Sequence, residues 1–294
     1  MTDVLGGATS TFLSSPYNYL IPYSLRFRGS SSNLTFFQRI ITSNAASFNN
    51  KNWTFSTWLK YTGQIDINKS IFSMSSNTGT GASGIGAWLS FNSSDRALRY
   101  THRNWDTSTV LTQKISTSYY KDPSAWYNII LLHDFTNPTA SDRVRLFING
   151  KREASFTNST DAPYNTTSNA PVGANLSFKI GCHPADLFMF SGYMTEINFV
   201  EGTTANCATF SNNTIVFRSG NTDNIGVGFF SSGNGVATDT LVTEIVNSTT
   251  LRISNNATAT ANGITMGFSP SIFNFGTNLD TTGLLFKSTG SGQL

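Results

Sequence analysis

Apolar and aromatic side chains recur at every second residue in many short segments of this chain, and this period of two constrains the fold most. Successive side chains of an extended strand point to opposite faces, so such segments predict half-buried strands. Residues 188–202, with the sequence FMFSGYMTEINFVEG, are an example. Extended, they divide into one apolar face and one mixed face: Tyr193, Thr195, Ile197 and Phe199 against Met194, Glu196, Asn198 and Val200. We interpret this segment as a strand, with Ser191-Gly192 and Glu201-Gly202 as flanking turns.

The rest of the chain favours an all-β protein. Strong helix formers never continue at a spacing of 3.6 residues, so we expect almost no α-helix. The 24 glycines predict many turns, and the 23 phenylalanines supply enough large side chains for a packed core. A length of 294 residues suits one large domain, or one large and one small domain.

Further strands are predicted throughout the first two thirds of the chain, at residues 23–29, 53–61, 71–75, 87–92, 97–102, 110–116, 126–135, 143–156 and 176–181. Residues 126–135 are the most apolar and should be central, with Trp126, Ile130 and Leu132 filling one face. Residues 157–175 are interpreted as a long polar loop.

Asn149-Gly150 marks a hairpin within residues 143–156, although its register stays open. A two-residue turn would place Lys151 and Glu153 on the face of Leu146 and Ile148. A three-residue loop would place Arg152, Ala154 and Phe156 there instead. We favour the three-residue loop because it keeps the apolar side chains together.

The two ends of the chain differ from this central part. Residues 1–22 are aromatic but show no period, so we expect a docking arm that packs onto a neighbouring surface. After residue 202 small residues dominate, and short strands are predicted at residues 213–219, 226–231, 241–247, 249–254 and 263–268.

Four motifs then occur in a telling order: FTFSTWLK, WYNIIL, RLFINGK and GYMTEINF. Together they resemble the concanavalin A-like, laminin-G-like jelly-roll domains, and more narrowly the versions found in virion proteins of tailed bacteriophages. The resemblance covers about residues 23–202 and implies an antiparallel jelly-roll sandwich, in which the early SLRF strand pairs with the closing strand. Residues 227–268 resemble a small β module of phage tail and capsid-attached proteins.

The expected organisation is therefore a docking arm at residues 1–22, a sandwich at 23–202 and a smaller β domain with a tail at 203–294. The resemblance implies a structural virion protein, made in the host cytoplasm, that decorates the capsid or serves as tail fibre or adaptor. It would bind other virion subunits and a host surface glycan, as a homo-oligomer such as a trimer. The alternatives are a free carbohydrate-binding lectin or adhesin, and a polysaccharide-degrading enzyme.

Charge and cysteine content narrow the partners. A net charge of +3 gives no global field that favours nucleic acid or an anionic membrane. We interpret the arginines at positions 96, 99 and 103 as part of a solvated strand face. No apolar run approaches the roughly 20 residues of a spanning helix, and the first residues lack a secretory signal. Cys182 and Cys207 are too few for a disulfide framework, so both should be reduced and buried.

The chemistry of the side chains predicts binding, with no catalytic residues, metal or cofactor. A glycoside hydrolase needs two facing carboxylates, whereas Glu196 stands alone on its strand. The acids of residues 92–95 and 134–142 lack the dense spacing of a calcium loop. Trp105, Tyr119 and Tyr120 lie in loop-like contexts, so we predict that they stack on sugar rings. The alternative, that they pack beneath their loops or against another subunit, stays open.

Overall fold

The computed structural model describes residues 24–30, 35–41, 51–62, 68–76, 84–164, 176–219, 221–223, 225–258 and 264–269. Within them the chain forms three antiparallel sheets and one short 3-10 helix, η2 (Ala140–Asp142), which confirms the predicted all-β class. None of the helices in these ranges is long and apolar enough to cross a membrane. The docking arm predicted at residues 1–22 lies outside the described residues.

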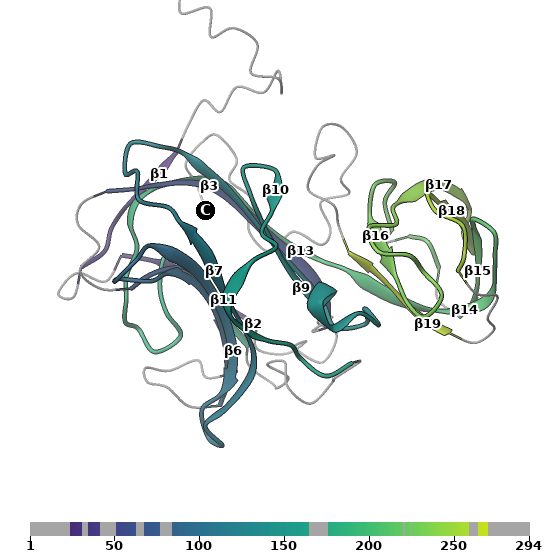
Figure 1. Ribbon diagram of the computed structural model, residues 1–294, viewed down its shortest axis with the longest axis horizontal. Helices are drawn as coiled ribbons and strands as arrows, with labels where there is room; N and C mark the ends of the chain where they lie inside the picture. The colour runs from purple at the N-terminus through teal and green to yellow at the C-terminus, as the bar shows by residue number, and fades with distance from the viewer. Residues whose placement is uncertain are drawn as a thin grey trace, which may run out of the picture.

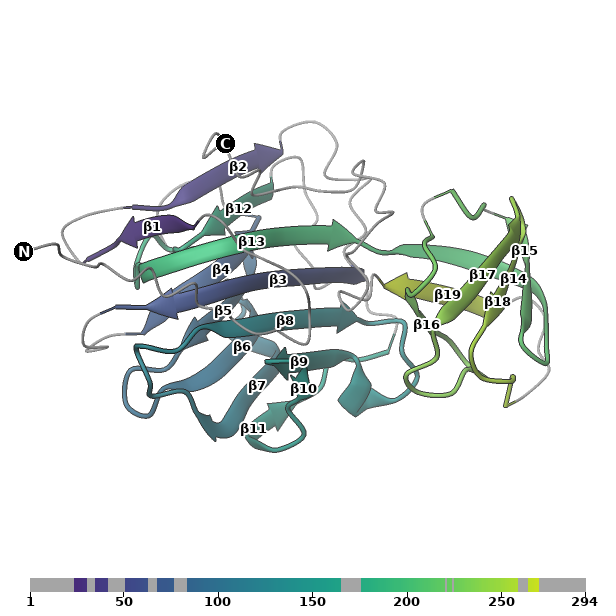
Figure 2. The ribbon, with the colours of Figure 1, turned by 90° about the horizontal axis from the view of Figure 1, so that it is seen from above.

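The first two sheets face each other as a sandwich, at one end of the molecule in Figure 1 and one behind the other in Figure 2. Sheet A has the order β1 (Leu25–Arg28), β13 (Ser191–Glu201), β3 (Asn52–Tyr61), β8 (Tyr127–Asp134), β9 (Val144–Ile148) and β10 (Lys151–Arg152). Sheet B has the order β11 (Phe156–Thr160), β7 (Thr109–Tyr119), β6 (Ala97–Asn104), β5 (Ile85–Phe91), β4 (Lys69–Ser75), β12 (Leu176–Ile180) and β2 (Phe37–Ile41). The expected pairing of the early strand with the closing strand is present, since β1 pairs with β13.

The core lies between the two sheets and is largely aromatic. Phe55 of β3 stacks on Phe72 of β4 with ring centroids 4.6 Å apart, and Trp53 stacks on Phe199 at 5.1 Å. All four side chains are at most 1% exposed. Because these contacts join strands of both sheets, they fix the sandwich as one packed unit.

The closing strand β13 departs from the predicted alternation. It carries a β-bulge at Glu196, whose φ of 49° is in the left-handed region. A bulge adds one residue to its strand, so the faces exchange beyond it. Met194 before the bulge and Ile197 and Phe199 after it therefore all belong to the core. The prediction that Met194 lies on the opposite face from the other two is wrong for this reason.

The hairpin at Asn149-Gly150 has the two-residue turn, so the three-residue loop that we favoured is wrong. Lys151 pairs with Ile148, and φ values of 50° and 79° at the two turn residues match a type I′ turn. The return strand β10 is short because the chain then crosses to sheet B, where β11 pairs with β7. Phe156 of β11 therefore has no need to share a face with β9.

Two other predictions in this region need correction. The polar loop predicted at residues 157–175 is wrong at its start, since residues up to Thr160 belong to β11. This strand is exposed along most of its length at the edge of sheet B, so it shows no apolar alternation. Trp126 fills no core face, because it precedes β8 and is 38% exposed.

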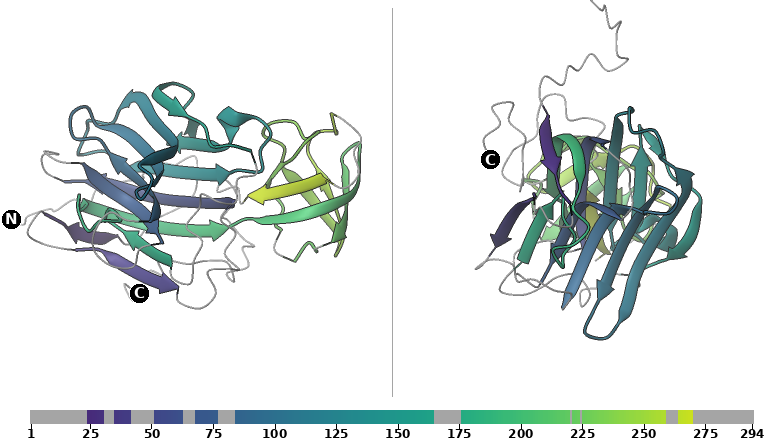
Figure 3. Two further views of the ribbon diagram at one scale, coloured as in Figure 1. Left: turned by 90° about the horizontal axis from the view of Figure 1, so that it is seen from below. Right: turned by 90° about the vertical axis from the view of Figure 1, so that its left-hand side faces the viewer.

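Sheet C forms the smaller part of the molecule, at the other end in Figures 1 and 3. Its order is β16 (Phe230–Ser232), β19 (Ile264–Ser269), β14 (Thr203–Ser211), β15 (Thr214–Ser219), β18 (Thr250–Ile253) and β17 (Val242–Asn247). A bridge between Phe230 and Leu241 joins β16 to the residue before β17, which brings the two edges of the sheet together. The core of this part includes Ile215, Leu251 and Met266.

The chain passes directly from β13 into β14, so the turn predicted at Glu201-Gly202 is wrong. The Gly202 N–H donates to the Asn52 carbonyl oxygen at 2.7 Å, which continues the pairing with β3. A Cβ atom at Gly202 would lie 2.3 Å from the Phe268 carbonyl oxygen. The absence of a side chain therefore allows β3 and β19 to approach each other across this residue.

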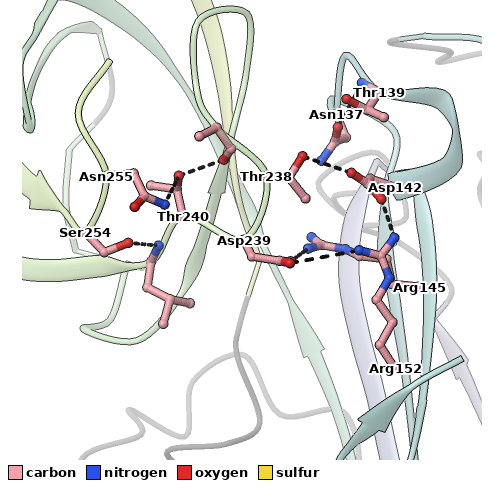
Figure 4. A network of polar contacts seen from close by, with 12 residues as sticks. Asn137, Thr139, Asp142, Arg145, Arg152, Thr238, Asp239, Thr240, Ser254 and Asn255 are labelled. Carbon is pink, nitrogen blue, oxygen red and sulfur yellow. Dashed lines mark hydrogen bonds and ion pairs between the residues drawn. The ribbon is translucent and has the colours of Figure 1, made fainter. Parts of the chain in front are cut away.

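A polar network connects sheet C with the sandwich, as Figure 4 shows. The Arg145 guanidinium of β9 donates to the Asp239 carboxylate at 2.8 Å and lies 4.6 Å from the centroid of the Phe230 ring. The Thr238 hydroxyl donates to Asp142 at 3.0 Å, and Asp142 also pairs with Arg152. The Arg145 side chain is only 1% exposed, so this contact buries a charge between the two parts.

Candidate functional site

The outer face of sheet B, which points away from the core, carries the most distinctive group of side chains. Trp105 lies in the turn between β6 and β7, and its ring stacks on Trp88 of β5 with centroids 5.2 Å apart and planes 18° apart. Trp88 is 8% exposed, whereas Trp105 is half-buried. The result is a layered indole pair whose upper member remains accessible.

The position of Trp105 follows from the backbone beneath it. A Cβ atom at Gly86 of β5 would lie 2.3 Å from Cζ3 of Trp105, so the ring occupies the space left by the missing side chain. The Trp105 N–H donates to the Gly84 carbonyl oxygen at 2.9 Å, and the Gly84 N–H donates to Asp106 at 3.0 Å. These bonds hold the turn against the start of β5, and thus hold the indole in place before any ligand binds.

Arginines flank the indole pair along β6. Gly86 pairs with Arg103, Trp88 with Thr101 and Ser90 with Arg99, so the three β6 residues alternate onto the tryptophan side of the sheet. The Arg99 Nε donates to the Thr101 hydroxyl at 3.2 Å. We refer to Trp88, Arg99, Thr101, Arg103 and Trp105 as the tryptophan face.

The loop between β12 and β13 forms one border of the tryptophan face. His183 of this loop contacts Trp88 edge to face, with ring centroids 4.8 Å apart. The loop is tied to the sheet by Lys179 of β12, which donates to Asp186 at 2.5 Å and to the Pro184 carbonyl oxygen at 3.1 Å. The only carboxylate in this border is therefore engaged by a lysine.

Electrostatics of the tryptophan face are dominated by positive charge. Burial, together with the nearby Arg103, lowers the pKa of Arg99. Burial also lowers the pKa of His183 to about 4, with Lys179 and Arg99 adding to this effect. At neutral pH the imidazole is thus uncharged, while the guanidinium groups repel each other across the strand.

Tyr119 and Tyr120, which we predicted to act with Trp105, lie at the opposite end of β7. That strand is 11 residues long, and at about 3.4 Å per residue it separates them from Trp105 by roughly 30 Å. Tyr119 is the last strand residue and is 53% exposed, with the Lys121 ammonium 5.1 Å from its ring centroid. The structure therefore does not bring the three predicted residues into one site.

Tyr120 is tied into the rim of the core. Its hydroxyl donates to Glu153 at 2.7 Å, and its ring meets Tyr127 edge to face at 5.6 Å. Its carbonyl oxygen accepts a hydrogen bond from the Tyr61 hydroxyl at 2.8 Å. Burial and the neighbouring Glu153 carboxylate raise the pKa of the Tyr120 phenol. These contacts give Tyr120 a packing role at the join between the two sheets.

The acids and histidines that sequence analysis weighed for catalysis lie elsewhere. Glu196 is at the bulge of β13 in sheet A, not beside the indole pair. His133 is 1% exposed and stacks on Trp53 with centroids 4.6 Å apart. Asp95 accepts hydrogen bonds from Asn92 and from the Ala97 N–H, as a turn residue does. In the part of the chain that the structure describes, no three His, Cys, Asp or Glu side chains cluster.

Arg99, Arg103, Trp88 and His183 belong to this face, and sequence analysis did not identify them as site residues. The spacing of Arg99, Thr101 and Arg103 at every second residue was visible, yet we interpreted it as a solvated face. The arginines are only half-exposed because the neighbouring strands and Trp105 crowd them. Cys182, expected to be reduced and buried, is a free and buried thiol in the bordering loop.

Comparisons with solved structures give weak likenesses, all with TM-scores below 0.5. The sialidase CBM40 of Ruminococcus gnavus, bound to alpha2,3 sialyllactose, has 15% identity and a TM-score of 0.37, over 49% of this chain and 72% of that chain. A heptameric SAP-like pentraxin from Limulus polyphemus has 12% identity and a TM-score of 0.33, over 51% and 63%. The LG1-3 region of the laminin alpha2 chain has 8% identity and a TM-score of 0.38, over 81% and 58%.

Sequence comparison is more decisive. No match was found among curated proteins. The family model described as the concanavalin A-like lectin/glucanases superfamily, Laminin_G_3, matches residues 37–206. That span is more than half of the 294 residues and runs from β2 of sheet B to the start of sheet C. The chain therefore belongs to the concanavalin A-like lectin/glucanases superfamily, as its Laminin_G_3 domain shows.

Proposed function

We propose that this protein is a binding protein that holds a glycan against the tryptophan face and catalyses no reaction on it. The observation that carries the proposal is the accessible Trp105 ring, stacked on Trp88 and positioned over Gly86. An aromatic ring held in this way offers a flat apolar surface to the C–H face of a sugar ring at little entropic cost.

The polar groups beside Trp105 support a sugar as the ligand. Arg99 and Arg103 supply N–H donors to hydroxyl groups, and a few such groups around an apolar platform are typical of small-molecule sites. Gln113 of β7 donates to the Thr101 hydroxyl at 3.2 Å and fixes the floor between the two arginines. Binding of this kind needs no pair of carboxylates.

We further propose that binding takes place on the virion of a tailed bacteriophage, where the protein is a capsid decoration or a tail fibre or adaptor. The support is the resemblance of four motifs within residues 23–202 to jelly-roll domains of such virion proteins. In this setting the protein would assemble as a homo-oligomer with other virion subunits, and the tryptophan face would meet a host surface glycan. The alternative is a free lectin with the same site.

Binding of the purified full chain to a glycan array tests the glycan proposal. We expect Trp105→Ala to weaken binding at least about tenfold, as loss of an aromatic anchor does. Trp126→Ala is the matched control, because it removes a tryptophan that is 38% exposed outside the tryptophan face. Equal binding by wild type and Trp105→Ala, or no glycan bound at all, would refute the proposal.

The virion setting needs its own experiment. The mass of the protein in solution separates an oligomeric virion subunit from a monomeric lectin, and neighbouring portal, capsid or tail genes would support the former. A stable monomer with Trp105-dependent glycan binding would favour the free lectin instead.

A further inference from the structure

Arg99 and Arg103 lie on the same face of β6 without a carboxylate partner. Every ion pair in the described part of the chain involves other residues, and the acid of the bordering loop is paired with Lys179. The two guanidinium groups are separated by one alternation of the strand, about 7 Å. Two like charges held half-buried at this distance oppose each other, so the fold gains nothing from their pairing.

The hydrogen bonds of the two arginines are also incomplete. Nε of Arg103 is buried and has no hydrogen-bond partner, although a guanidinium presents five donors. Arg99 makes its hydrogen bond to Thr101, a neutral hydroxyl that compensates none of its charge. A buried donor without an acceptor is unfavourable in the free protein, and an incoming anion would remove this cost.

We propose that the ligand of the tryptophan face is an acidic glycan, whose carboxylate or sulfate group is bound by Arg99 and Arg103. A planar guanidinium matches both groups with paired hydrogen bonds. Trp105 would support the sugar ring, while the arginines on the adjacent strand take the acid. This inference rests on the proposed glycan binding and adds the charge of the ligand.

The indole pair fixes where the acidic group would lie. Trp88 pairs with Thr101, so Arg99 and Arg103 are its two diagonal neighbours on β6. Trp105 covers Gly86, the residue directly opposite Arg103. A sugar on the outer side of Trp105 would thus present a ring substituent toward Arg103 first. We therefore expect Arg103 to contribute more than Arg99.

Acidic and neutral glycans that share one scaffold provide the test. The probes are 3′-sialyllactose for a carboxylate, 3′-sulfolactose for a sulfate and lactose as the neutral counterpart, with trigalacturonate and its methyl ester as a second pair. The full chain is titrated with each probe by calorimetry and screened on an array of acidic and neutral glycans. We expect affinity for acidic members only, weakened as sodium chloride is raised.

Variants assign the effect to the arginines. Arg103→Gln and Arg99→Gln should each lower affinity for the bound acidic glycan about tenfold or more, as loss of a hydrogen bond between charged groups does. Arg28→Gln is the matched control, because Arg28 is an exposed arginine on β1 of sheet A. A thermal unfolding midpoint close to that of wild type shows that each variant is folded.

The outcomes separate this inference from the proposed function. Trp105-dependent binding confined to neutral glycans, or binding of acidic glycans that both Gln variants leave unchanged, would overturn the acidic ligand while the glycan proposal stands. No binding to any array member would overturn both. Loss of acidic binding in the Gln variants, with Arg28→Gln unchanged, is the result that supports it.

Discussion

Replacing Asp239 by alanine tests how the sandwich and sheet C are held together. Asp239 is the acceptor of the Arg145 guanidinium, whose side chain is only 1% exposed at the contact (Figure 4). The substitution leaves a buried positive charge without its hydrogen-bonded carboxylate. Burial already lowers the pKa of Arg145, and Asp134 and Asp239 counteract this effect. Removing one of these two acids should therefore destabilise the contact.

The magnitude follows from the exposure of the pair. A hydrogen bond to a charged group contributes about 1.5–3 kcal/mol when protected from water. The Asp239 side chain is 56% exposed, so water screens part of this energy. Arg145 also keeps its contact with Phe230, at 4.6 Å from the ring centroid. We expect the free energy of unfolding to fall by about 1–2 kcal/mol.

Urea unfolding measures the effect with two probes. All five tryptophans precede residue 203, so their fluorescence follows the sandwich, whereas far-UV circular dichroism follows all three sheets. Asp223→Ala is the matched control, because Asp223 is an exposed acid of the same part that interacts with neighbouring Asn221. A double-mutant cycle with Arg145→Met isolates the pair. A coupling energy below about 0.5 kcal/mol would refute the reasoning.

Three other predictions follow from particular residues. Gly86→Val should displace Trp105 and abolish glycan binding while leaving the core intact, measured by array binding and thermal unfolding. Burial lowers the pKa of His102 to about 3, so the unfolded chain binds the extra proton below pH 6.5. Stability should then fall between pH 7 and 5 by about 2 kcal/mol less in His102→Phe than in wild type, measured by urea midpoints. Gly150→Ala, at a φ of 79°, should cost about 1 kcal/mol, and an unchanged midpoint would contradict the type I′ turn.

Much of the sandwich could be predicted because its buried strands alternate. Residues 53–61 and 97–102 match β3 and β6 closely, since each has a face packed on the aromatic core. Local insertions were invisible for the same reason. The bulge at Glu196 shifts the faces of β13 by one residue, and it depends on the pairing with β3 rather than on any local residue type.

Edge strands and the site itself escaped prediction. β2 and β11 lie at the two edges of sheet B, where exposure removes the apolar alternation. Trp105 was identified from its loop context, but its partner Trp88 reads as an ordinary strand residue. Only the register of β5 against β6 brings Trp88, Arg99 and Arg103 together. Such proximity comes from long-range pairing, which a single sequence does not display.

Indole N–H signals in a 15N NMR titration test the central claim most directly, that the tryptophan face is the binding surface. The full chain carries five indoles, each assigned by its Trp→Phe variant and titrated with 3′-sialyllactose and trigalacturonate. We expect the signals of Trp88 and Trp105 to shift in a saturable way, while those of Trp53 and Trp126 stay in place. Saturable shifts at Trp126, or unchanged signals of Trp88 and Trp105 at saturating glycan, would contradict the account.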